Sequence, residues 1–181
     1  MVNAKQTRER AAADQAGIVT HTTAIVAGEQ TAEIAVYQPL TEQTRMTVTI
    51  GHLMMTFTSA AAVHKILEGF AAVRPALMGV DNTTAPIAVR GAEFALNTMS
   101  ITWIYPPTYA IVRGNRYSKD QRRTIYWVDV HMGPITWRIA DHTGYHSLIE
   151  GLRNAHRTAV GVFLDGRKYR KDPTDRDAFT D

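Results

Sequence analysis

The chain has 181 residues and a formal net charge of +3 at pH 7, and it contains no cysteine. With 45% hydrophobic and 20% charged residues, it has the composition of a folded protein that buries one good core or two small ones. The missing cysteine excludes disulfides and thiolate metal sites. The sequence shows neither a signal-peptide pattern nor a long apolar segment, so we expect a cytoplasmic protein without a membrane partner.

The first part of the chain indicates a flexible arm followed by strands. Residues 1–15 are charged and rich in alanine, which is typical of an arm that lies outside the core. Residues 17–27 and 32–37 are rich in Ile, Val and Thr and predict strands. Residues 45–50 and 53–58 alternate apolar and polar side chains, so we expect them to form a hairpin around the turn Gly51-His52.

A helix and a connection are expected next. Ser59 is a good N-cap, and an apolar stripe with helical spacing follows it until Pro75. Residues 76–99 then form a connection rich in turn residues, with short strands possible at 87–89 and 94–96.

The second half of the chain predicts the same order of elements. A hairpin is expected over 124–132 and 135–140, and Asp141 is a good N-cap for a helix that runs to about Arg157. Residues 160–164 are an apolar run that suggests a final strand. We expect 166–181 to be a disordered tail, first basic and then acidic.

These two halves form an internal repeat. Residues 51–70 align without a gap on residues 133–152, which lie 82 positions further along. A second match, of residues 22–28 with residues 108–114, has an offset of 86. The expected domain is therefore a single duplicated one over 16–165, with repeat one at 16–75, the connection at 76–99 and repeat two at 100–160.

The expected fold class is α+β, with antiparallel strands followed by one helix in each repeat and a pseudo-twofold axis between the halves. Gly69 and Gly151 recur inside the two helices, where glycine costs about 1 kcal/mol relative to alanine. Their recurrence predicts close packing, either where the helices cross or where each helix meets the facing sheet.

Basic residues are concentrated in the second half of the chain. Residues 1–100 hold 7 Lys or Arg against 8 Asp or Glu, whereas residues 101–181 hold 13 against 9. We expect the segment 113–123 to be a projecting basic hairpin that grips a phosphate backbone. The candidate nucleic-acid-binding residues are Arg113, Arg116, Tyr117, Lys119, Arg122, Arg123, Trp127, Arg138, Arg167, Lys168, Arg170 and Lys171.

Aromatic side chains accompany these cations. Seven of the ten Trp and Tyr residues lie between Trp103 and Trp137. Strand alternation places Trp127 opposite the core face, where it can stack on a base, whereas we expect Trp103 and Trp137 to be buried.

The order of strands, hairpin and helix over 17–74 and 100–157 resembles that of Whirly proteins and PUR-repeat proteins. The Lys-Gly-Lys signature of Whirly proteins is absent, so no contact residue is carried over. The resemblance implies a Whirly-like fold whose sheet faces and hairpins bind single-stranded DNA or RNA, and it is compatible with a homo-oligomer.

Two other functions remain open at this point. His64 with Glu68, and His146 with Glu150, lie at i and i+4, and symmetric helices would bring the pairs together as a metal site, with His142 extending the second stripe. Exposed strand edges would alternatively serve a protein-interaction or self-assembly module. No phosphate-binding loop or activated-nucleophile motif is found, so we expect no enzyme and no cofactor.

Overall fold

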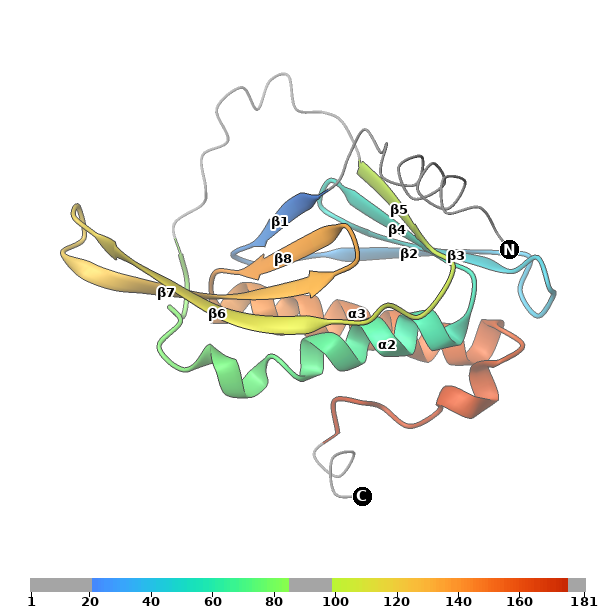
Figure 1. Cartoon of the computed structure of the whole chain (residues 1–181). Helices are drawn as coiled ribbons and strands as arrows, with labels where there is room; N and C mark the ends of the chain where they lie inside the picture. The colour runs from blue at the N-terminus through green and yellow to red at the C-terminus, as the bar shows by residue number, and fades with distance from the viewer. Residues whose placement is uncertain (1–20, 85–98, 176–181) are drawn as a thin grey trace, which may run out of the picture.

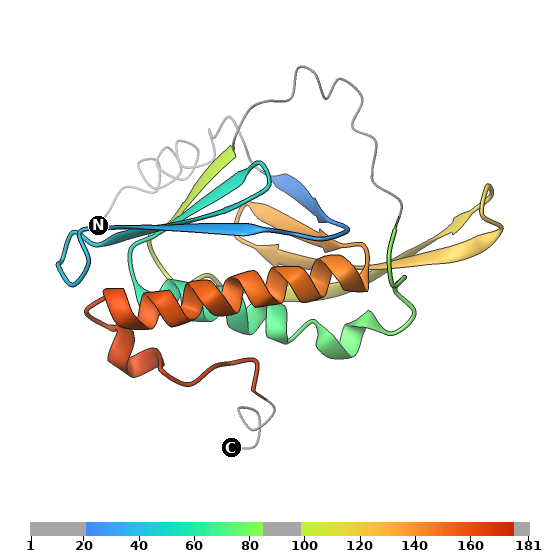
Figure 2. The same ribbon diagram turned by 180° about the vertical axis from the view of Figure 1, so that it is seen from behind.

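The computed structural model describes residues 21–84 and 99–175. Two sheets lie on one side of the molecule and two long helices lie side by side on the other (Figures 1 and 2). The elements in chain order are β1 (Thr22–Val26), β2 (Ala32–Tyr37), β3 (Arg45–Ile50), β4 (Leu53–Phe57), α2 (Ala60–Ala71), η1 (Arg74–Leu77), β5 (Met99–Trp103), β6 (Ala110–Ser118), β7 (Arg123–Met132), β8 (Ile135–Ile139), α3 (His142–Val162) and η3 (Gly166–Tyr169).

Both sheets have four strands and the same connectivity. Their strand orders are β1-β8-β7-β6 in the first sheet and β5-β4-β3-β2 in the second. Three consecutive strands of each sheet are antiparallel, and the fourth, β1 or β5, pairs in parallel with the strand that precedes the helix. The fold is therefore α+β with two mixed sheets and two helices. The expectation of purely antiparallel strands is wrong, because β1 and β5 each join the sheet built mainly by the other half of the chain.

The predicted hairpins and helix starts are confirmed. Each hairpin has a two-residue turn whose first residue, Gly51 or Gly133, has a φ of 56°. This left-handed conformation is the one that tight hairpin turns require and that glycine adopts without strain. The side chains of Ser59 and Asp141 each accept a hydrogen bond from the backbone amide three residues later, so both act as N-caps.

The core lies between the sheets and the helices. Alternate side chains of β3, β4, β7 and β8 are buried, and so are the apolar stripes of α2 and α3. Trp103 and Trp137 are 6% and 2% exposed, which confirms their assignment to the core. The two glycines expected inside the helices pack against sheets: a Cβ on Gly69 would collide with the side chain of Met132, and one on Gly151 would lie 2.7 Å from the Cβ of Ala32. Each helix thus meets a strand of the facing half.

Two predictions near the repeat ends are wrong. The residues 160–164 do not form a strand, because α3 continues to Val162 and buries Ala155 and Ala159 on the same helical stripe. The match of residues 22–28 with residues 108–114 does not join equivalent strands. β1 and β6 are opposite edges of one sheet, and the strand whose position corresponds to β1 is β5.

Much of the expected disordered tail is packed against the helices. After α3, Asp165 accepts hydrogen bonds from the amides of Ala60 and Ala61, so it caps the start of α2. The ring of Tyr169 packs against that of His64, and Thr174 is buried. The remainder of the tail, the N-terminal arm and the possible strands at 87–89 and 94–96 lie outside the described residues.

Candidate nucleic-acid interface

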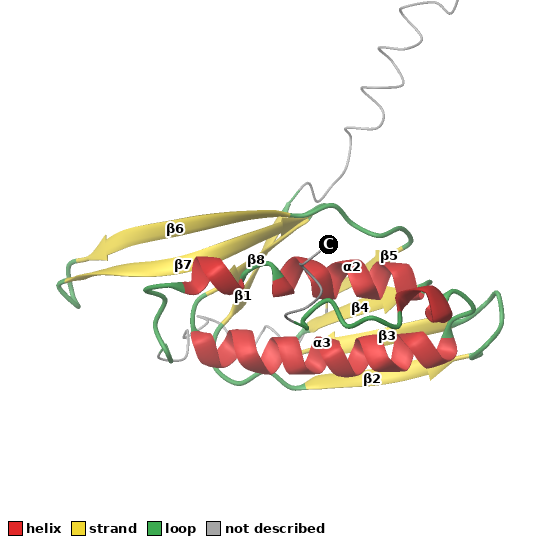
Figure 3. Ribbon diagram, turned by 90° about the horizontal axis from the view of Figure 1, so that it is seen from below, coloured by secondary structure: helices red, strands yellow, loops and turns green. Residues whose placement is uncertain are grey.

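The hairpin of β6 and β7 extends well beyond the helices, as Figure 3 shows. Its strands pair from Ala110 with His131 to Ser118 with Arg123, so the turn consists of residues 119–122. The expected basic loop is therefore mostly strand, but it projects as predicted. Arg122 has a φ of 51°, a conformation that places this non-glycine residue in the left-handed region at the tip.

Several cations of this hairpin are available to a ligand. Arg116, Lys119 and Arg122 are exposed, and none of them forms an ion pair with the part of the chain that the structure describes. Alternation along the strands places Arg116 on the same face as Trp127, away from the helices. Tyr117, which is 63% exposed, lies on the opposite face of the hairpin. The structure therefore does not gather all predicted residues on one surface.

Trp127 belongs to a small polar cluster on the outer face of the first sheet. Its indole lies against Gly114 of β6, where a Cβ would collide with the ring, and its Nε1 donates to Asp129 at 3.0 Å. Arg138 binds the same carboxylate through two hydrogen bonds of 2.8 and 2.9 Å, and its guanidinium lies 4.7 Å from the indole centroid. Burial raises the pKa of Asp129, but these hydrogen bonds outweigh it, so the net pKa is lowered. Trp127 is thus half-buried, with a fixed orientation.

A cavity of about 460 Å³ adjoins this cluster. Trp127, Arg116, Arg138 and Arg123 line it together with Asp81, which lies in the connection after η1. Four of the predicted binding residues, from three strands, therefore meet around one hollow. Such a hollow, with apolar walls and a few convergent polar groups, has the size of ordinary ligand pockets.

Besides Arg138, two more of the predicted cations have partners within the protein. Arg123 binds Asp81 through two hydrogen bonds of 2.6 Å, and this contact lowers the pKa of Asp81. Arg113 donates to the carbonyl oxygen of Met78, and its guanidinium lies over the ring of Tyr126. Both arginines thus fasten the hairpin to the segment that follows α2, Arg113 from the middle of β6 and Arg123 from the start of β7, next to the turn.

The second basic cluster lies elsewhere. Arg167 and Lys168 belong to η3, and Arg170 and Lys171 follow it, all exposed. In Figures 1 and 2 this orange-red end of the chain and the yellow hairpin lie at opposite ends of the molecule. The structure does not bring the two clusters together.

The outer face of the second sheet has a different character. Alternation places Thr47, Thr49, Thr56 and Thr102 on this outer face. The charged residues that β2–β5 contribute to it are Glu33 and Arg45, whose charges offset each other. Only the first sheet combines an excess of cations with an outward-facing tryptophan.

The structure does not form the metal site considered above. His64 of α2 faces His156 of α3, with 3.1 Å between Nδ1 and Nε2, and His146 lies beside His142 instead. Glu68 accepts hydrogen bonds from Lys65 and Tyr109. Within 21–84 and 99–175, no three metal-ligating side chains are grouped. The two His/Glu pairs, considered as an alternative site, therefore do not meet.

The His64–His156 pair makes stability depend on pH. Burial lowers the pKa of both imidazoles, and the charge of His64 lowers the pKa of His156 further. Lys65 acts in the same direction on His64, whereas Glu68 and Asp172 oppose the shift without reversing it. Because the unfolded chain binds these protons more readily, the free energy of unfolding should fall as pH drops below about 6.5, by up to about 2.7 kcal/mol per pH unit for two protons.

Urea denaturation between pH 7.5 and 5 measures this slope, a range that lies above the titration of most carboxylates. The double variant His64→Gln/His156→Gln should lose most of it. An unchanged slope in that variant would show that other groups cause the pH dependence.

Some site residues were not found from the sequence. The contact of Asp129 with Arg138 follows from the two-residue turn at Gly133, because that turn fixes the register of the hairpin. No comparable signal marks Asp81, which reaches Arg123 through tertiary packing.

In the described residues no helix is long and apolar enough to cross a membrane. No family model matches the chain, and neither a curated protein nor a solved structure is significantly similar to it.

Proposed function

We propose that this protein binds single-stranded nucleic acid, in the first instance single-stranded DNA, across the outer face of the first sheet and along the β6–β7 hairpin. The observation that carries the proposal is the common face of Arg116, Trp127 and Arg138 around one cavity, continued by the exposed cations at the hairpin tip. Cations that follow phosphates and an aromatic side chain that contacts a base are the two requirements of single-strand binding.

The strand would run from the hairpin tip toward the cavity. Lys119 and Arg122 would contact phosphates at the tip, and Arg116 would contact the next ones. One unstacked base would enter the cavity against the edge of Trp127, whose orientation the hydrogen bond to Asp129 fixes. Duplex DNA cannot present a base in this way without unpairing, so a preference for single strands is expected.

The arrangement of the two halves supports a duplicated, Whirly-like unit. The second strands of the equivalent hairpins and the helices that follow them start 82 residues apart, and the strand orders of the sheets correspond. The reciprocal exchange of β1 and β5 is what a pseudo-twofold axis would produce. Such a unit has exposed edge strands, here β1, β6, β2 and β5, which would permit a homo-oligomer. We propose a binding protein rather than an enzyme.

Fluorescence anisotropy with a labelled single-stranded oligonucleotide tests the proposal. Binding should weaken steeply between 50 and 200 mM salt, by about tenfold or more if several phosphates are contacted, and unlabelled duplex should compete poorly. Trp127→Leu should weaken binding by about five- to tenfold through the lost aromatic contact.

The Trp127 variant should keep its thermal stability to within a few degrees, which circular dichroism would verify. Absence of oligonucleotide binding at low salt would contradict the proposal and favour a protein-interaction module. Equal affinity for duplex and single strand would contradict the proposed entry of a base.

A further inference from the structure

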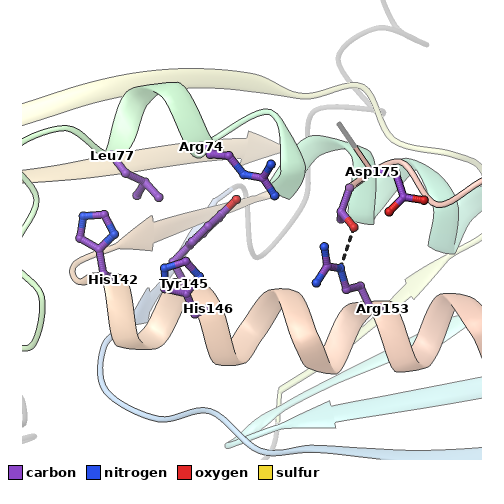
Figure 4. A pocket seen from close by; sticks show the side chains of 8 residues that line it. Arg74, Leu77, His142, Tyr145, His146, Arg153 and Asp175 are labelled. Carbon is purple, nitrogen blue, oxygen red and sulfur yellow. Dashed lines mark hydrogen bonds between the residues drawn. The ribbon is translucent and has the colours of Figure 1, made fainter. Parts of the chain in front are cut away.

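A second cavity, of about 550 Å³, lies on the helix side of the molecule, away from the outer face of the first sheet (Figure 4). Its walls come from η1, from the first three turns of α3 and from residues 174–175. None of its residues belongs to the interface proposed above. Its volume lies within the range of ordinary small-molecule sites.

The charged groups of this cavity are mainly basic. Arg74 and Arg153 reach into it from η1 and α3, and Asp175 is its one acidic residue. Arg74 is exposed and forms no ion pair within the described ranges. Arg153 is held in place by a 2.6 Å hydrogen bond from Nε to Thr174, and its nearest carboxylates, of Glu150 and Asp172, lie 3.7 and 3.9 Å away. Among the described residues Arg74 thus has no carboxylate partner, and Arg153 is only partly neutralised by two carboxylates near the outer limit of an ion pair.

Aromatic rings and neutral donors complete the cavity. The imidazoles of His142 and His146 stack with their centroids 6.0 Å apart, and Tyr145 packs edge-on against His146 at 5.4 Å. Even neutral imidazole carries one N–H donor. Leu77 adds an apolar wall. The cavity therefore offers donors for an oxyanion next to flat surfaces for a ring.

We propose that this cavity binds a small phosphate monoester with a planar organic group, of the size of a nucleoside monophosphate. The guanidinium fork matches the oxygen spacing of a phosphoryl group and forms strong charge-assisted hydrogen bonds with it. The phosphoryl group lies between Arg74 and Arg153, and the planar group lies against the histidine rings. This site stands independently of the nucleic-acid interface.

Isothermal titration calorimetry of the full chain tests the proposal with three probes: adenosine 5′-monophosphate, inorganic phosphate and adenosine. The monophosphate should bind best, phosphate more weakly, and adenosine without measurable affinity. Arg74→Gln should weaken binding of the monophosphate about tenfold, because one charge-assisted contact is lost. Asp175→Asn should strengthen it about threefold, because a repelling charge is removed.

Arg167→Gln, a charge loss outside the cavity, is the matched control and should bind all probes as the unmodified chain does. The melting temperatures of the unliganded variants verify folding, which the exposed position of Arg74 should not disturb. Three results would overturn the proposal: no binding of the monophosphate at millimolar concentration, equal binding of adenosine, or unchanged affinity in Arg74→Gln. Loss of oligonucleotide binding in Arg74→Gln would show that the cavity belongs to the nucleic-acid-binding surface, and this result would overturn the proposal as well.

Discussion

Replacing Asp141 with alanine should lower the free energy of unfolding by roughly 3–5 kcal/mol. The loss arises because α3 loses its N-cap and at least two buried donors are left without an acceptor. The side chain is completely buried and accepts hydrogen bonds from three backbone amides, those of Gly28, Thr84 and Gly144. It therefore joins the end of β1, the connection and the start of α3. Chemical denaturation monitored by circular dichroism measures the loss.

Ser59→Ala is the matched control, because the Ser59 side chain caps the equivalent helix by accepting a single hydrogen bond, from the amide of Ala62. Its cost should be about 1 kcal/mol. A loss below 1.5 kcal/mol in Asp141→Ala would show that water replaces the carboxylate. Burial acts to raise the pKa of Asp141. The hydrogen bonds from Thr84, Gly144 and Gly28 act in the opposite direction and outweigh burial, so the pKa of Asp141 is lowered. The stabilisation should therefore be present above pH 4 and decline as pH falls below that value.

Removing the three free cations of the hairpin should weaken binding of single-stranded DNA about 100-fold at low salt, at about 1 kcal/mol for each phosphate contact. The variant combines Arg116→Gln, Lys119→Gln and Arg122→Asn, the last chosen because asparagine tolerates the left-handed conformation at the tip. The slope of log K against log salt should become shallower by about 2, the value for three single-strand phosphates. Anisotropy titrations at four salt concentrations measure both quantities.

A charge-matched control changes Arg167, Lys168 and Arg170 to glutamine at the opposite end of the molecule. It removes the same net charge, so a general electrostatic effect would reduce affinity similarly in both variants. The proposed interface requires a much larger loss in the hairpin variant. Equal losses of affinity in the two variants would show that the nucleic acid does not bind to a defined face of the protein, which would contradict the proposed interface.

The sequence is sufficient for the elements whose signals are local. Period-two alternation defined both short hairpins, and a glycine with positive φ at each turn fixed their registers. Two N-caps defined where the helices begin. The C-terminal end of α3 could not be predicted in this way, because Val160 and Val162 favour strands locally and tertiary packing keeps them helical.

The candidate site was predictable only in part. Arg116 and Trp127 are adjacent in space because antiparallel pairing places residue Ile125 beside Arg116, which a correct hairpin register implies. The ion pair of Arg123 with Asp81 and the hydrogen bond from Arg113 to the carbonyl oxygen of Met78 depend on long-range packing, and residue type gives no sign of them. A lysine or arginine is available to bind a ligand only where no such partner within the protein holds it.

The exchange of edge strands has a consequence for how the chain folds. β1 pairs with β8, from Thr22 with Ile135 to Val26 with Ile139, so the first sheet closes only after the chain has been synthesised beyond residue 139. β5 likewise completes a sheet that begins with β2. Pairings of such large sequence separation slow folding and leave no half that can be complete alone. The two halves should therefore unfold in a single cooperative transition, and a chain cut in the connection should recover its structure only when both pieces are present together.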